Sequence, residues 1–240
     1  MKTLANKIMD SLASFARPEK AAFLPRFFKC GEGQYGEGDQ FIGVMVPDAR
    51  RVAKTHEEAD AGTLLELLLS PVHEHRLTAL LILVLQFKKR RGDDEREAIV
   101  NFYIEHVDRV NNWDLVDLSC YNILGPWLEH RDRGLLHDWA RSGHLWRQRV
   151  AMVTCMHFAR GGDSEGCFAI ADILLHHPHD LIHKAVGWIL REVGKRDRPA
   201  LDTYLLPRYR QMPRTMLRYA IERHDAAERR AFLAGTRGDE

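Results

Sequence analysis

Signals that start helices recur along the whole 240-residue chain, whereas sustained strand-type alternation of apolar and polar residues is nearly absent. Thr3 is suited to cap a first helix, and Pro18 and Pro47 suit the first turn of later ones. The chain is therefore expected to be all-α. The predicted helices cover approximately residues 3–15, 18–29, 47–56, 63–69, 71–91, 93–108, 112–124, 132–141, 144–160, 165–176, 179–195, 199–210, 213–223 and 226–234.

The connections between these predicted helices are short, which favours antiparallel neighbours. Successive helix pairs recur at roughly 35–45 residues, close to the period of HEAT-type repeats. The sequence therefore predicts a curved solenoid of antiparallel HEAT-like helical repeats, whose concave face can hold a long ligand. No segment has the composition of a linker, so we expect one domain over residues 1–240, with its core at about 3–224.

Composition and charge narrow the class of protein. The apolar fraction of 45% is ordinary for a globular protein, and no run approaches the roughly 18 uncharged residues of a membrane span. The four cysteines show no CxxC spacing, which suggests free thiols and a cytoplasmic location. The net charge is +1, but residues 141–224 hold 14 Lys and Arg against 8 Asp and Glu, a net charge of +6. This asymmetry favours a polyanionic partner.

Trp113 and Asp117 lie four residues apart at the start of a predicted helix, so they share one face of it. Asn111 or Asn112 can cap this helix, and Asp114 in its first turn suits the positive end of the helix dipole, which makes Asp114 a structural residue. Capping does not require the second acid. Asp117 is therefore a candidate functional carboxylate, although a buried Trp beside a solvated Asp is an equally simple interpretation.

A second indole, Trp188, occurs in a row of cations. Lys184, Trp188, Arg191 and Lys195 follow helical spacing and form one stripe, while the apolar residues around Ile189 occupy the opposite side. An aromatic ring among cations can act as a cation–π shelf or as a ligand surface. Aromatic and basic side chains in alternation are also typical of nucleic-acid grooves.

Two pairs of arginines begin later helices. Arg147 and Arg149 lie near the start of one helix, where positive charge conflicts with the helix dipole unless an anion binds there. Arg214 and Arg218 repeat this arrangement behind Pro213. Pairing of Arg218 with Glu222 is the alternative to a phosphate contact.

Three other motifs do not indicate a site. Gly31–Gly36 matches GxGxxG, but no strand precedes it, so a loop is expected. The histidines between His176 and His183 lack the Cys or acidic partners of an ordinary metal centre. His73-Glu74-His75 faces different sides of a helix and lacks the HExxH spacing. We therefore expect no metal and no cofactor.

Five blocks of this sequence resemble the DNA alkylation repair family of HEAT-like-repeat DNA glycosylases. They are Tyr35–Val44 with Val46-Pro47, Asn112–Asp117, Leu145–Arg149, His183–Glu192 and Met212–Ala220. The resemblance spans about residues 20–223 and implies an all-α solenoid that binds duplex DNA containing alkylated purines. It further implies excision of N3- and N7-alkylated purines in base excision repair, without a cofactor. The sequence itself gives no signal of an oligomer or of an obligate protein partner, so we expect a monomer.

The resemblance implies roles for four residues. It assigns a catalytic carboxylate to Asp117, a neighbouring indole to Trp113, an arginine to Arg149 and a second indole to Trp188. Lys184, Arg147, Arg191, Lys195, Arg214 and Arg218 are the further candidates for contacts with DNA phosphates. The alternative function is a non-catalytic helical scaffold that binds DNA structures or protein partners, for which Asp117 would be dispensable.

Overall fold

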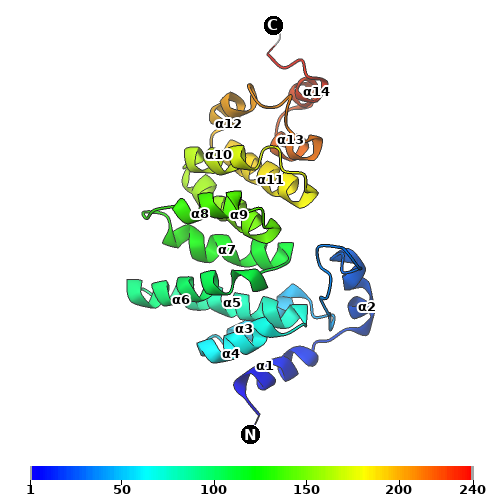
Figure 1. Cartoon of the computed structure of the whole chain (residues 1–240), viewed down its shortest axis with the longest axis vertical. Coiled ribbons are helices and arrows are strands. Elements are labelled where there is room, and N and C mark those ends of the chain that lie inside the picture. The colour runs from blue at the N-terminus through cyan, green and yellow to red at the C-terminus, as the bar shows by residue number, and fades with distance from the viewer. Residues whose placement is uncertain (1, 239–240) are drawn as a thin grey trace. The chain divides into compact units, whose positions relative to one another are not determined.

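The computed structural model describes residues 2–238 and is all-helical (Figure 1). Across these residues, the one β-type pairing is an isolated bridge between Gln40 and Val72. The predicted all-α class is therefore confirmed. The helices are α1 (Leu4–Ala13), α2 (Pro18–Phe27), α3 (Val46–Thr55), α4 (Ala61–Leu69), α5 (His73–Lys89), α6 (Asp93–Glu105), a 3-10 turn (Val107–Arg109), α7 (Trp113–Trp127), α8 (Gly134–Arg141), α9 (Leu145–Gly161), α10 (Ser164–Ile173), α11 (Asp180–Arg196), α12 (Arg198–Leu205), α13 (Arg214–Ala220) and α14 (Ala226–Ala234).

Local capping explains most helix starts. The side chains of Thr3, Asp60 and Asp163 each accept a hydrogen bond from a backbone N–H in the first turn of α1, α4 and α10. Asp225 forms a complete capping box with Glu228 at α14.

Several predicted boundaries were wrong by a few residues. Helix α5 begins at His73 rather than Pro71, because residues 71–73 pair with the loop at Gln40 instead. The sequence favours Asp93 or Asp94 as the N-cap of α6, but the N-cap in the structure is Gly92. Helix α12 ends at Leu205, five residues earlier than expected.

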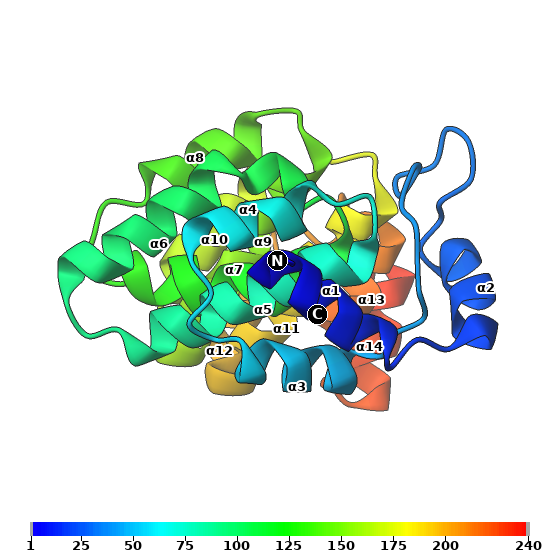
Figure 2. The same cartoon turned by 90° about the horizontal axis from the view of Figure 1, so that it is seen from below.

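The chain divides into two compact units, Met1–Ser119 and Cys120–Glu240, and the division falls within α7. In the first unit, α5 is the central helix and packs against α3, α4 and α6, while α1 packs on α3 and α4. Most of α5 is buried, including four charged or polar residues at its start. Helix α2 buries none of its residues and stands to one side of α3, α4 and α5 (Figures 1 and 2).

The second unit is built around α9 and α11, which pack against each other. Helices α8 and α10 cover α9, and α12 and α13 cover α11, so each helix packs mainly on near neighbours in sequence, as in helical repeats. Helix α13 approaches α11 most closely at Gly187, where an added Cβ would overlap the Met216 carbonyl oxygen. A single domain over both units stays a prediction.

Among residues 2–238, no helix combines the length and the apolar content needed to cross a bilayer.

All four cysteines are free thiols, of which Cys120, Cys155 and Cys167 are buried and Cys30 is half-buried. Burial, together with the nearby carboxylate of Asp39, raises the pKa of Cys30 to about 11.

Candidate functional site

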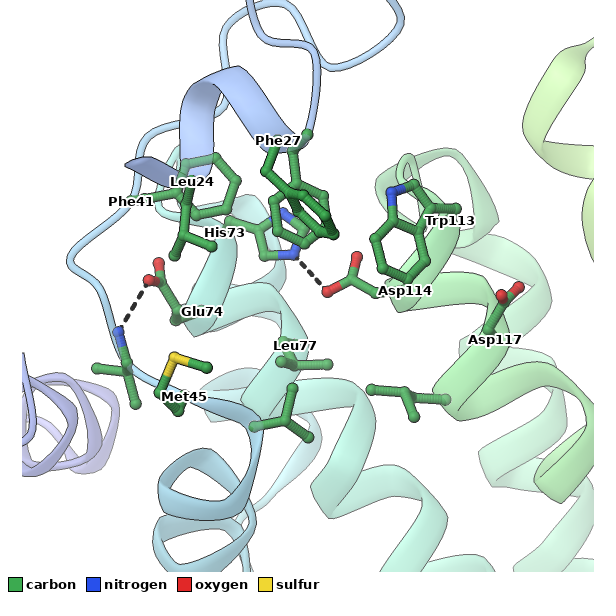
Figure 3. Close-up of a pocket in the computed structure, with 14 residues that line it drawn as sticks. Leu24, Phe27, Phe41, Met45, His73, Glu74, Leu77, Trp113, Asp114 and Asp117 are labelled. Atoms are coloured by element: carbon green, nitrogen blue, oxygen red, sulfur yellow. Dashed lines mark hydrogen bonds and ion pairs between the residues drawn. The ribbon is translucent and has the colours of Figure 1, made fainter. Parts of the chain in front are cut away.

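Trp113 and Asp117 lie on one face at the start of α7, as the sequence predicted (Figure 3). Asn112 begins the helix: its side-chain oxygen accepts from the Trp113 N–H at 2.9 Å, and its carbonyl accepts from the Val116 N–H. Trp113 and Asp117 are both half-buried, whereas Leu115 and Val116 on the opposite side are fully buried. The first turns of α7 therefore present an indole and a carboxylate together, at the edge of the core.

A cavity of about 340 Å³ opens beside this pair, within the first unit. Its wall is almost entirely apolar, and Figure 3 shows Trp113 and Asp117 on the α7 side of it, with the indole of Trp113 turned toward Phe27. The lining residues are Leu24, Phe27, Phe28, Phe41, Val44, Met45, Val46, His73, Glu74, Leu77, Trp113, Asp114, Asp117 and Leu118.

Aromatic rings form a continuous cluster along the cavity wall. The ring of Phe28 stacks on Trp113 with centroids 5.1 Å apart and on Phe41 at the same distance. Phe27 meets Trp113 edge-on at 5.8 Å, although 51% of Phe27 is exposed. Trp113 is thus neither a core residue nor a free surface residue: it is the outer member of an aromatic stack that links α2 to α7.

Beneath these rings lies a buried network of charged side chains. His73 is 2% exposed and bridges two carboxylates, with Nδ1 3.0 Å from Asp39 and Nε2 2.9 Å from Asp114. Asp39 also accepts hydrogen bonds from the guanidinium of Arg76 and the amide of Asn112. Burial alone would lower the pKa of His73, but Asp114 and Asp39 outweigh it and raise the pKa to about 9.

Glu74, the next residue of α5, holds the loop that precedes α3. Its carboxylate is buried and accepts hydrogen bonds from the backbone N–H groups of Ile42, Gly43 and Val44, the one from Gly43 at 2.7 Å. Gly43 has φ +83°, and a Cβ there would overlap the Arg17 carbonyl oxygen, so only glycine fits. Glu74 and Gly43 together fix one wall of the cavity.

The sequence reasoning missed His73 and Glu74 because it tested His73-Glu74-His75 against metal-binding spacing alone. The three side chains do point in different directions, but each has its own internal partner, His75 bonding to Ser70 at 2.9 Å. Consecutive charged residues at the start of an otherwise apolar helix were the available signal, since such groups are buried only when they are paired. Asp114 was interpreted as structural, and its bond to His73 agrees with a role inside the fold.

The remaining candidates lie in the second unit. Arg147 is half-buried, whereas Arg149 is only 5% exposed and donates a hydrogen bond to the carbonyl of Leu181 at the start of α11. Arg149 therefore connects the start of α9 to the start of α11.

Trp188 lies outside the apolar face of α11, as expected: it is half-buried, while Ile189, Leu190 and five other residues of the helix are buried. Its neighbouring cations are engaged with carboxylates. Lys184 pairs with Asp180 at 2.7 Å, and Lys195 with Glu192 at 2.6 Å.

Arg191 pairs with Glu222, which lies in the turn after α13. The expected alternative was a pair between Glu222 and Arg218, so the structure assigns the carboxylate to a different arginine. Arg218 and Arg214 are exposed on α13, where Arg214 also donates to the Leu233 carbonyl. Arg214 and Arg218 are therefore more exposed to an anion than Arg191, whose side chain is 18% exposed.

The glycine-rich loop and the histidine cluster, which the sequence did not identify as sites, have structural roles. Residues 31–39 form a loop of turns, as predicted. His177 bonds to Gln148, and His179 caps α11 through the Leu181 N–H. Among the described residues, no three His, Cys, Asp or Glu side chains are arranged to hold a metal ion.

The chain resembles a known protein family and a solved structure. The sequence profile described as DNA alkylation repair enzyme matches residues 8–224, which is most of the chain and includes both units. The chain belongs to the DNA alkylation repair enzyme family. Membership supports a role in DNA repair and an enzymatic activity that acts on DNA.

A solved structure described as a predicted DNA alkylation repair enzyme from Enterococcus faecalis resembles the chain with a TM-score of 0.65. The alignment covers 88% of this chain and 97% of that one at 16% sequence identity, so the likeness shows a shared fold. No curated protein matches the sequence.

Proposed function

We propose that this family member is a DNA glycosylase that hydrolyses the N-glycosidic bond of cationic N3- or N7-alkylated purines in duplex DNA. The observation that carries the proposal is the placement of Asp117 beside Trp113, at the rim of an aromatic cavity in a member of a DNA alkylation repair family. We further propose that it acts in the cytoplasm, as a monomer and without a cofactor.

The chemistry of such substrates requires one well-placed anion. A purine alkylated at N3 or N7 already carries positive charge, so its departure needs no general acid. Positive charge develops on the deoxyribose as the bond breaks, and a carboxylate stabilises it best where water is partly excluded. Asp117 is half-buried beside apolar walls, which strengthens its electrostatic effect, and it can also position the attacking water.

The other acids at the cavity are committed to the fold. Asp114 accepts from His73 and from the Leu115 N–H, and Glu74 accepts from the loop at residues 42–44. A single active carboxylate differs from the paired acids of ordinary glycoside hydrolases. We assign the reaction to Asp117, the acid that lines the cavity on the same helix face as Trp113.

Aromatic and basic side chains supply the proposed contacts with DNA. We propose that Trp113 and Trp188 contact the sugar and the positive charge through their ring faces. Arg149 would bind a phosphate after releasing or sharing the Leu181 carbonyl. Arg147, Arg214 and Arg218 are further candidates, of which Arg214 and Arg218 are exposed, while Lys184, Arg191 and Lys195 would have to release or share their carboxylate partners.

The direct test is release of free base from a duplex containing 7-methylguanine, compared between wild type and Asp117→Asn. This substitution keeps size and removes charge, so single-turnover excision should fall about a hundredfold or more. Affinity for the duplex should hold or increase, because a negative charge near phosphates is removed. Asp138→Asn, at an exposed carboxylate of α8, is the matched control and should retain wild-type excision.

A wild-type excision rate in Asp117→Asn would refute the assignment. Tight duplex binding without release of any alkylated base by the wild-type protein would instead favour the alternative, a non-catalytic scaffold that binds DNA structures.

A further inference from the structure

We propose that His73 is a positioning residue for the reaction at Asp117: as a doubly protonated imidazolium held between Asp39 and Asp114, it fixes the start of α7 against α5 and the preceding loop. The inference deepens the proposed function and rests on it. His73 does not reach the substrate in this role; it acts through the helix that carries Trp113 and Asp117.

The hydrogen-bond geometry requires both ring nitrogens of His73 to be donors. Each faces a carboxylate oxygen, at 3.0 Å and 2.9 Å, and an ionised carboxylate can only accept. A neutral imidazole would set one nitrogen lone pair against an oxygen lone pair. Asp39 also accepts hydrogen bonds from Arg76 and Asn112, and its charged partners His73 and Arg76 outweigh burial and lower the pKa of its carboxyl. Asp114 accepts a further hydrogen bond from the Leu115 N–H.

The position of the network explains why it matters for the site. Asp39 belongs to the loop after α2, His73 is the first residue of α5, and Asp114 is the second residue of α7, so one imidazolium joins three segments. Asp114 lies between Trp113 and Asp117 and turns toward His73 (Figure 3). A shift in Asp114 therefore changes the orientation of the first turn of α7.

A second contact path runs through the aromatic rings. The His73 ring stacks on Phe41 with centroids 4.8 Å apart and lies 4.8 Å from Phe28, which in turn stacks on Trp113. Loss of the charge on His73 would break a donor bond to a buried carboxylate and loosen this stack at the same time. Excision should then decrease although no group that touches DNA has changed.

The pH at which this happens follows from the surroundings of the ring. Asp39 from the loop and Asp114 from α7 face His73. Arg76 of α5 binds the same Asp39 and Cys30 lies near it, while Glu74 of α5 binds the loop at residues 42–44 instead. Burial lowers the pKa of His73, and the two aspartates raise it to about 9, above the value of about 6.5 in an unfolded chain. Its stabilising contribution is thus complete below about pH 6.5 and is lost as pH rises through 9.

The experiment compares wild type, His73→Gln and His75→Gln in the full chain. His75 is the matched control: it is a histidine of the same helix, and burial, with Arg76 nearby, lowers its pKa to about 4, so it stays neutral over the tested range. Single-turnover excision of 7-methylguanine and duplex affinity are measured from pH 6 to 9.5, with enzyme-free blanks at each pH for ring opening of the base.

We expect the wild-type rate constant to fall about fourfold between pH 7 and 9.5, because about a quarter of the His73 rings are still protonated at pH 9.5, with duplex affinity changed less than threefold beyond the blank. His73→Gln should be slowed about tenfold or more at pH 7 and should show no further fall with pH. His75→Gln should keep both the rate and the pH profile of the wild type. A pH profile of His73→Gln that matches the wild type, or equal losses in the two variants, would overturn the proposal.

Two physical measurements keep the proposal testable apart from activity. Nitrogen NMR of ¹⁵N-imidazole-labelled protein should show both ring nitrogens of His73 protonated at pH 7; a neutral ring would overturn the proposal even if His73→Gln fails to fold. Amide hydrogen exchange in the first turn of α7 should be at least tenfold faster in His73→Gln than in His75→Gln. If the wild type releases no base, the glycosylase proposal fails, whereas unchanged exchange in α7 would mean that the positioning role fails.

Discussion

Gly187 offers the sharpest test of how the second unit is packed. It precedes Trp188 in α11, and a Cβ at this position would overlap the Met216 carbonyl oxygen and lie 2.5 Å from the Tyr219 Cβ. Both obstacles are on α13, and neither is the end of a flexible side chain. Gly187→Ala therefore requires α13 to move away from α11, because the helix backbone cannot yield locally.

The size of the effect follows from two opposing terms. Alanine in a helix interior gains about 1 kcal/mol of helix propensity over glycine, while overpacking of a close contact costs roughly 1–3 kcal/mol or more. Since the overlap involves backbone, we expect the upper part of that range and a net loss of about 2 kcal/mol. For a chain of this size, this lowers Tm by roughly 4–8 °C.

The matched control is Gly161→Ala at the end of α9, where an added Cβ meets nothing within 4 Å. Thermal melts and urea titrations of both variants, with circular dichroism as the readout, measure the difference. Gly161→Ala should be neutral or slightly stabilising. A Gly187→Ala variant as stable as the wild type would refute the close packing of α11 on α13.

Other substitutions test individual contacts. Glu74→Gln should lower the free energy of unfolding by on the order of 2–3 kcal/mol, measured in urea, because buried N–H groups lose a charged acceptor. Trp113→Ala and Trp188→Ala should each cost roughly 2 kcal/mol, less than a fully buried Trp, yet slow single-turnover excision more than tenfold; full activity in either would remove that Trp from the site. Arg218→Ala should reduce the salt slope of duplex binding by about one unit, whereas Arg191→Ala, whose side chain already pairs with a carboxylate, should leave the slope nearly unchanged; the reverse result would exchange their roles.

Much of the fold followed from local chemistry in the sequence. Caps such as Thr3 and the prolines at 18 and 47 act within a single turn, so their positions predicted helix starts to within a residue or two. The start of α5 was misplaced because the pairing of Gln40 with residues 71–73 joins segments about 30 residues apart. Such non-local pairing leaves no periodic signal in the sequence.

The candidate site was predictable only where spacing determines geometry. The i, i+4 relation placed Trp113 and Asp117 on one face of α7, and the structure confirms that placement. The aromatic cavity and the His73 network could not be foreseen, because Phe28, Asp39 and His73 come from three segments that meet only in the folded chain. The burial of Arg149 could not be predicted from spacing either, because its hydrogen-bond acceptor is a carbonyl of α11, 32 residues away in the sequence.

The burial of the cysteines and the raised pKa of Cys30 determine how readily alkylating reagents attack them. Electrophiles that methylate purines also attack sulfur, and the species they attack is the thiolate. Three of the four thiols are buried, and the half-buried one, with a pKa of about 11, is ionised in only about one molecule in ten thousand at pH 7. The chain therefore presents almost no thiolate to its surroundings, so its cysteines react slowly with the reagents that damage DNA.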